Sequence, residues 1–146
     1  MSTLIIEKAK LKNLKDLIYL LFDDDLGKDR ENISETSFNN YKKSFMKILN
    51  DSNNEIFTMI LNDQIIGTMQ LTLIPGLSME GMTRCQIETV RIKKDYRNKG
   101  YGSELIKKGI EIAKLNKCGL IQLTSNKERP KAINFYKKLG FLSTHK

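Results

Sequence analysis

Hydrophobic and polar positions in the first half of the chain predict a strand, two helices and a β-hairpin. Apolar residues recur at helical spacing in two segments, which begin after the capping residues Asn13 and Ser34 or Thr36. Two segments rich in β-branched residues surround a short polar turn, which is typical of an antiparallel hairpin. The predicted elements are a strand at 4–6, helices at 14–22 and about 34–49, and hairpin strands at 56–61 and 65–74.

The second half of the chain alternates strands with helices. Pro-Gly at 75–76 ends the hairpin, and segment 77–84 is expected to be a mobile loop. The next predicted elements are a strand at 86–92, a helix at 103–115, a strand at 120–124, a helix from Pro130 to the capping Gly140, and a last strand from Phe141. A strand, helix and strand in this order can form a right-handed crossover with parallel strands. We therefore expect one α/β domain over residues 1–146, with a mixed, mostly antiparallel sheet flanked by helices.

The positive charge of the chain lies in its second half. The formal net charge is +8; residues 1–90 carry 10 Lys and Arg against 13 Asp and Glu, whereas residues 91–146 carry 15 against 4. This asymmetry indicates a phosphorylated ligand bound by the second half, although solvated, lysine-rich helices would give the same count. Since no segment resembles an aromatic RNA-binding platform, we do not expect a nucleic-acid partner.

Composition also argues against several classes of protein. No apolar run approaches the roughly 18 residues of a membrane span, and no basic segment with an apolar core opens the chain, so a cytoplasmic protein without a membrane partner is expected. Cys85 and Cys118 fit no ligand-pair spacing and are expected to be buried free thiols. With His145 as the single histidine, no metal site is expected.

Residues 90–103, Val-Arg-Ile-Lys-Lys-Asp-Tyr-Arg-Asn-Lys-Gly-Tyr-Gly-Ser, carry the most specific pattern. They predict the end of a strand, a basic turn with two glycines and the start of a helix. Such a turn presents unpaired backbone N–H groups and the positive end of a helix dipole, and Arg97 and Lys99 add mobile charge, so it can bind a phosphate. Leu105 replaces the third glycine of a dinucleotide fingerprint, and the Gly-Lys-Ser/Thr of a Walker loop is absent.

Two segments at a specific spacing resemble one protein family. Arg97-Asn98-Lys99-Gly100-Tyr101-Gly102 resembles the pyrophosphate loop of the GNAT superfamily of N-acetyltransferases, and 132–141 resembles its last helix and turn, Ala-x-x-Phe-Tyr-x-x-x-Gly-Phe. Segments 74–78, 86–88 and 122–124 further resemble a small bacterial subgroup. The resemblance covers about residues 3–145. It implies the GNAT fold, acetyl-CoA as cosubstrate, and direct attack by an acceptor amine without a covalent enzyme intermediate.

The resemblance also implies which residues hold the coenzyme. Pantetheine would run along the strand edge formed by Val90, Arg91 and Ile92, where a backbone N–H near Val90 would polarise the thioester carbonyl. Asn126, just after the next strand, would contact the CoA moiety. The pyrophosphate would lie against Arg97, Asn98, Lys99, Gly100, Tyr101, Gly102 and Ser103.

Two residues are candidates for proton transfer. Tyr136 occupies the position of the family's general acid and would protonate the departing CoA thiolate; the alternative is a core aromatic residue. Glu88 stands two residues before Val90, is therefore expected on the same strand face, and could accept the proton of the amine. An ordinary strand glutamate or a substrate-binding carboxylate are the alternatives for Glu88.

The acceptor is the part of the reaction that the sequence constrains least. Acidic residues follow the first helix (Asp23, Asp24, Asp25, Asp29 and Glu31), and they predict a small cationic amine unless they are only a solvated loop. Relatives often have Asn where this chain has Arg129, and the chain ends at Lys146, earlier than the subgroup does. One wall of the acceptor pocket could then come from a second subunit of a homodimer. A specialised acceptor, a protein or peptide amine, another acyl donor, and a non-catalytic CoA-sensing module stay open.

Overall fold

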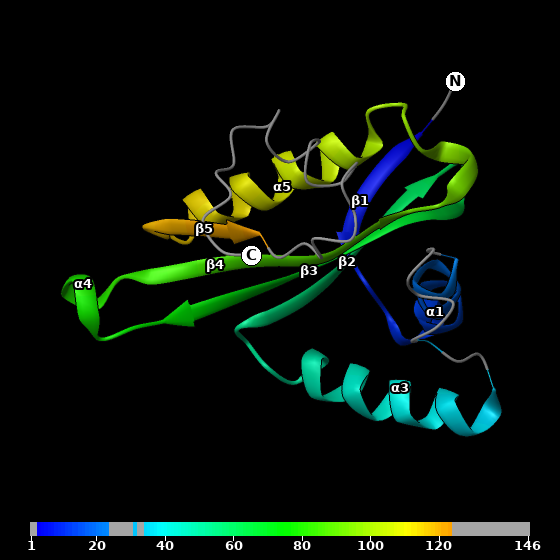
Figure 1. The fold of residues 1–146 in the computed structure, drawn as a ribbon, viewed down its shortest axis with the longest axis horizontal. Helices are drawn as coiled ribbons and strands as arrows, with labels where there is room; N and C mark the ends of the chain where they lie inside the picture. Colours follow the sequence, from blue (N-terminus) through cyan, green and yellow to red (C-terminus); the bar gives the residue numbers. More distant parts are fainter. Residues whose placement is uncertain (1–2, 24–30, 32–33, 124–146) are drawn as a thin grey trace.

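The computed structural model describes residues 3–23, 31 and 34–123, which form a five-stranded sheet with helices on both faces (Figure 1). The predicted last helix and last strand lie outside the described residues. The strands are β1 (Leu4–Lys8), β2 (Asn54–Leu61), β3 (Gln64–Pro75), β4 (Thr83–Ile92) and β5 (Leu120–Leu123). The helices are α1 (Leu14–Phe22), α3 (Glu35–Leu49), the short α4 (Ser78–Gly81) and α5 (Tyr101–Leu115), with 3-10 turns η1 (Leu11–Asn13) and η2 (Lys94–Tyr96).

The order of strands in the sheet follows their order in the chain. β1, β2, β3 and β4 pair antiparallel, and β4 pairs parallel with β5 through the connection that contains α5. The predictions of a mixed, mostly antiparallel sheet, of the central hairpin and of the parallel pair are confirmed. At the hairpin turn, Asn62 and Asp63 have φ values of 49° and 68°. Positive φ at both positions is the geometry that matches the right-handed twist of paired strands.

Two hydrophobic cores lie on opposite faces of the sheet. One packs α5 against the sheet and includes Met59, Met69 and Ile87, all with 0% of their surface exposed. The other packs α1 and α3 against the opposite face and contains Leu17 and Phe45. Figure 1 shows α5 above the sheet and the two other helices below it. Successive side chains of each central strand therefore point alternately into the two cores.

Several element boundaries differ from the predictions. β4 begins at Thr83 rather than at residue 86, and α4 occupies half of the segment 77–84 predicted as a loop. The N–H of Gly76 donates to the carbonyl of Met82 at 3.1 Å and closes this turn. α5 begins at Tyr101, two residues before the prediction, because Gly100 serves as its N-cap. Asn13 precedes α1 as predicted, but its Oδ1 accepts the N–H of Lys10 instead of capping the helix.

Gly109 allows α5 to lie close to β4, and its replacement by alanine is expected to destabilise the fold. A Cβ at residue 109 would lie 2.7 Å from Cδ1 of Ile87, which is fully buried. Overpacking costs about 1–3 kcal/mol, against a gain in helix propensity of about 1 kcal/mol. The net loss should appear as a lower urea midpoint for Gly109→Ala. In an Ile87→Val background, which lacks Cδ1, the same substitution should cost less; an equal cost in both backgrounds would contradict this packing.

Candidate active site

A β-bulge interrupts β4 in the middle of the sheet. Thr68 pairs with Arg91 and Gln70 pairs with Glu88, so Met69 of β3 faces two residues of β4, Thr89 and Val90. Thr89 has a φ of 54°, a left-handed conformation that β-branched residues rarely adopt. Strain of this kind costs about 1–3 kcal/mol and concentrates at functional sites.

The bulge changes which side chains share a face of the sheet. Val90 and Ile92 pack with the core beneath α5, whereas Glu88 lies opposite Gln70, which lines a cavity under α1 and α3. The expectation that Glu88 and Val90 share a face is therefore wrong. The rule of alternate faces holds only without an extra residue, and the bulge inserts one between them.

Beyond the bulge, β4 offers part of its edge to a ligand. β5 pairs with β4 only as far as Ile87 and Leu123. Among the described residues, no strand continues on this side of β4 along residues 88–92. Such an edge can pair with an extended ligand as it would with another strand. The carbonyl of Val90 accepts from Nη1 of Arg91 at 3.0 Å, and that of Ile92 accepts from Nε of Arg97 at 2.9 Å. Each carbonyl retains a second lone pair for a ligand donor.

The turn after β4 has the geometry of an anion site. Asn98 and Gly100 have φ values of 62° and 88°, and the N–H of Glu104 donates to the carbonyl of Gly100 at 3.2 Å. Residues 101–103 form the first turn of α5, whose N–H groups have no carbonyl within the helix. A Cβ built on Gly100 meets no atom within 4 Å, so the space in front of this turn is open. The Nζ of Lys99 lies 6.0 Å from the centre of the Tyr96 ring.

Arg97 has a more fixed position than the sequence suggests. Its Nε donates to the carbonyl of Ile92 at 2.9 Å, and its Nη2 donates to the carbonyl of Asp23 at 3.3 Å, at the end of α1. The expectation that Arg97 is a mobile charge is therefore wrong. The guanidinium joins the turn after β4 to the end of β4 and to α1, and its other N–H groups can still reach an anion.

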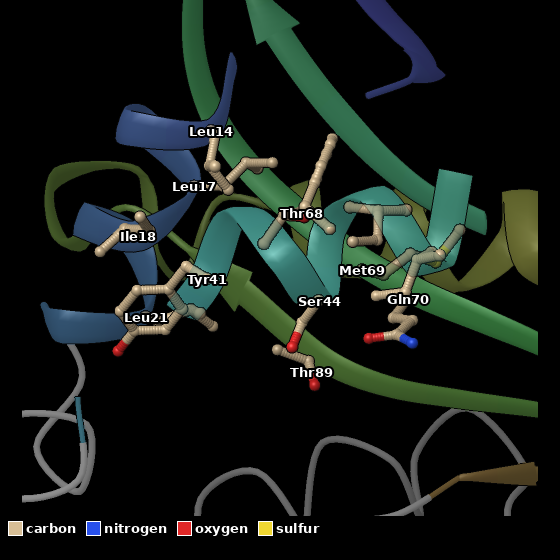
Figure 2. A pocket seen from close by; sticks show the side chains of 13 residues that line it. Leu14, Leu17, Ile18, Leu21, Tyr41, Ser44, Thr68, Met69, Gln70 and Thr89 are labelled. Carbon is tan, nitrogen blue, oxygen red and sulfur yellow. The ribbon is translucent and has the colours of Figure 1, made fainter. Parts of the chain in front are cut away.

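A cavity of about 150 Å³ lies on the other side of the sheet, between α1, α3 and the bulged part of β4 (Figure 2). Its lining is mainly hydrophobic. The polar side chains of Ser44, Gln70 and Thr89 lie together on one side of it in Figure 2. The lining residues are Leu14, Leu17, Ile18, Leu21, Tyr41, Ser44, Phe45, Ile48, Ile56, Thr68, Met69, Gln70 and Thr89.

Glu88 lies on the β4 side of this cavity. It precedes the lining residue Thr89, pairs with the lining residue Gln70, and its Oε2 accepts from Nε2 of Gln86 at 3.2 Å.

The helical spacing of α1 and α3 predicted a buried face but not the cavity, because residues that line a cavity and residues that fill a core have the same pattern. No local signal distinguishes the two cases.

The other predicted residues divide between described and undescribed parts of the chain. Tyr136, Asn126, Asp24, Asp25 and Asp29 lie outside the described residues. Asp23 ends α1, and Glu31 accepts the hydroxyl of Tyr41 at 2.7 Å.

Cys85 is buried and Cys118 is half-buried, and both are free thiols. Burial, with a smaller contribution from Cys118, raises the pKa of Cys85 to about 11, and burial also raises the pKa of Cys118. Both thiols therefore stay protonated near neutral pH and are poor nucleophiles. In the part of the chain that the structure describes, no cluster of His, Cys, Asp or Glu could hold a metal ion. None of its helices is long and apolar enough to cross a membrane.

The bulged strand β4 is thus followed by a helix, α5, whose N-cap is a glycine. The chain belongs to the acetyltransferase (GNAT) family, whose model matches residues 14–141. The structure superposes on a transcriptional regulator from Bacillus halodurans C-125 with a TM-score of 0.94 and 38% identity, over 99% of this chain and 96% of that one. Glucosamine-6-phosphate N-acetyltransferase from Arabidopsis thaliana shares the fold, with a TM-score of 0.79 and 18% identity over 99% and 95% of the two chains.

Two curated relatives match over shorter segments. An uncharacterised N-acetyltransferase of Methanocaldococcus jannaschii is 39% identical over 56 residues, which are 38% of this chain and 25% of that protein. Glucosamine 6-phosphate N-acetyltransferase of Trypanosoma brucei brucei is 33% identical over 78 residues, 53% of this chain and 51% of that protein. The matched segments thus span about a quarter and about half of the two relatives.

Proposed function

We propose that this protein transfers the acetyl group of acetyl-CoA to the amine of a small acceptor. The observation that carries the proposal is the continuity of two ligand-binding features. Among the described residues no strand pairs with residues 88–92 of β4 on the β5 side, and this edge leads within a few residues to the open turn at Gly100. An extended chain with a pyrophosphate at one end, as in coenzyme A, matches that arrangement.

The donor would be held by main-chain groups at both features. The pyrophosphate would accept hydrogen bonds from N–H groups of the turn and first helical turn, residues 97–103, with Lys99 and Arg97 adding positive charge. Pantetheine would lie along residues 90–92 as an added strand. The bulge at Thr89 and Val90 would turn one backbone N–H toward the thioester oxygen, where it stabilises the oxyanion. Asn126 is a further proposed contact.

The transfer itself requires two proton movements. The amine nitrogen attacks the thioester carbon, the C–S bond breaks, and CoA leaves as a thiolate whose conjugate acid has a pKa of about 8.5. Tyr136 is proposed to protonate the thiolate. An alkylammonium ion has a pKa near 10, so it must lose a proton first, and Glu88 is proposed to accept it. The protonated state of Cys85 and Cys118 is consistent with direct attack rather than an acyl-cysteine intermediate.

We propose a cationic acceptor because carboxylates lie on the acceptor side of the sheet. Glu88 lies beside the cavity, and Glu31 bonds the hydroxyl of Tyr41, which lines it. An ammonium group beside Glu88 would be stabilised by that charge until it transfers its proton.

A second candidate is a coenzyme A-binding module that regulates transcription without catalysis. It is favoured by the name of the Bacillus halodurans relative, a transcriptional regulator, and by the net charge of +11 of residues 91–146, from 15 basic and 4 acidic residues.

Thermal shift and thiol release separate the two candidates. Acetyl-CoA at about 100 times its Kd should stabilise the fold by about 2.7 kcal/mol, whereas duplex DNA should not. A panel of amines should then produce amine-dependent release of free CoA thiol. Stabilisation by acetyl-CoA with no release from any amine would favour the binding module. No stabilisation by acetyl-CoA would contradict both candidates.

A further inference from the structure

The cavity beside Glu88 is partly open to solvent, and its volume limits how much of an apolar group it can bury. At about 150 Å³ it equals an engineered cavity in another protein that is lined by Leu, Ile and Phe, stays dry and binds benzene. The walls here are of the same kind, with Leu17, Ile18 and Phe45 buried around it. The space therefore suits one compact apolar group.

The interior of the cavity has little capacity to bond a polar ligand. The hydroxyl of Thr68 donates to the carbonyl of Phe57 at 2.8 Å, and the hydroxyl of Tyr41 donates to Glu31 at 2.7 Å. A sugar ring placed here would lose hydrogen bonds to water and regain few of them, which is unfavourable for every hydroxyl group left without a partner.

Three of the polar side chains that line the cavity lie near β4. Ser44, Gln70 and Thr89 point to the β4 side in Figure 2. Thr89 is the bulge residue between Glu88 and Val90, so a polar group held there lies beside the proposed base and the proposed thioester site. A molecule with one apolar end and one amine would place its apolar end under α1 and its amine at the bulge.

We infer that the acceptor is a primary amine attached to a compact hydrophobic group, such as a phenyl ring or a branched alkyl chain. This inference rests on the proposed function and names the acceptor class for the same site. It excludes aminosugars and polyamines as preferred acceptors, although both are cationic. Ile48 and the other apolar lining residues then select the acceptor by the volume they leave.

A series of amines tests this selection by CoA thiol release. In straight-chain alkylamines, kcat/KM should rise about fourfold for each buried methylene until the cavity is full, and then fall. Benzylamine should exceed glucosamine and spermidine at matched concentration. Higher kcat/KM for glucosamine or spermidine would overturn the inference and leave the proposed function intact. If no amine of the series produced free CoA thiol, both the inference and the proposed function would be overturned.

Variants of Ile48 show whether the cavity is the cause. Ile48 lies on α3, lines the cavity and is half-buried, so it can be changed without a large effect on the core. Ile48→Phe should move the preferred chain length down by a few methylenes, and Ile48→Ala should move it up. Loss of stability cannot produce shifts in opposite directions. Met46, on the same helix, does not line the cavity and is 38% exposed, so Met46→Phe and Met46→Ala are matched controls.

The outcomes of this variant series are distinct. Opposite shifts with Ile48 variants, none with Met46 variants, and an unchanged thermal shift with acetyl-CoA would support the inference. An unchanged preference in both Ile48 variants would overturn it.

Discussion

Gly100→Val is expected to weaken acetyl-CoA binding by about 100-fold or more, because the side chain would occupy the space in front of the phosphate turn. That space is open in the protein itself, since an added Cβ meets no atom within 4 Å. Loss of two hydrogen bonds to a charged group, at about 1.5–3 kcal/mol each, corresponds to at least this factor. Isothermal titration with acetyl-CoA measures the change directly.

Backbone strain must be separated from blocked binding in this variant. Gly100 has a φ of 88°, which any L-residue adopts at a cost of about 1–2 kcal/mol, and more if it is β-branched. Gly81, the last residue of α4, has a φ of 77° and lies far from the turn at Gly100; a Cβ there would have its nearest neighbour at 3.9 Å. Gly81→Val thus carries a similar strain and should keep full affinity. Equal affinities of the two variants would falsify the placement of the pyrophosphate.

Glu88→Gln is expected to lower kcat/KM by about 100- to 10,000-fold at pH 7, the usual contribution of a general base. Affinity for acetyl-CoA should not change, because Glu88 lies on the sheet face opposite to Val90. The loss should diminish as the pH rises toward the amine pKa of about 10, since the variant depends on amine that is already deprotonated. Initial rates of thiol release between about pH 6.5 and about pH 9.5, a range that lies below the amine pKa, test both expectations.

The pH profile distinguishes a base from a binding carboxylate. If Glu88 only binds the ammonium ion, Glu88→Gln should raise KM, and this rise should become smaller at high pH. The kcat of the variant should then be unaffected at every pH. Glu7→Gln is a suitable control, because Glu7 is also a half-buried glutamate in a strand, at the distant edge strand β1. If Glu88→Gln behaves like Glu7→Gln, Glu88 has neither role.

Much of the fold could be predicted because its signals are local. The spacing of apolar residues in α1 and α3 repeats within each helix, and Asn62 and Asp63 readily adopt the positive φ of their turn. Gly100 marks the turn before α5 by its residue type alone, since glycine adopts the left-handed conformation of this turn without strain.

The two errors at the site have one physical source, which is contact between segments that are distant in the chain. Thr89 would not be predicted in a left-handed conformation from its residue type; the register that β3 imposes on both sides of the bulge requires it. Arg97 is held by the carbonyl of Asp23, 74 residues earlier. Neither partner is visible in the local pattern around the residue.

The sequence by itself determined the family, the order of the five described strands and of α1, α3 and α5, and the glycine turn before α5, because residue type and short-range spacing govern all three. Only the tertiary structure decided that Glu88 and Val90 lie on opposite faces and that Arg97 is a fixed link. It also decided the size of the cavity, because α1, α3 and β3 each supply part of a wall. A cavity is the volume that packed segments leave empty, so no single segment encodes it.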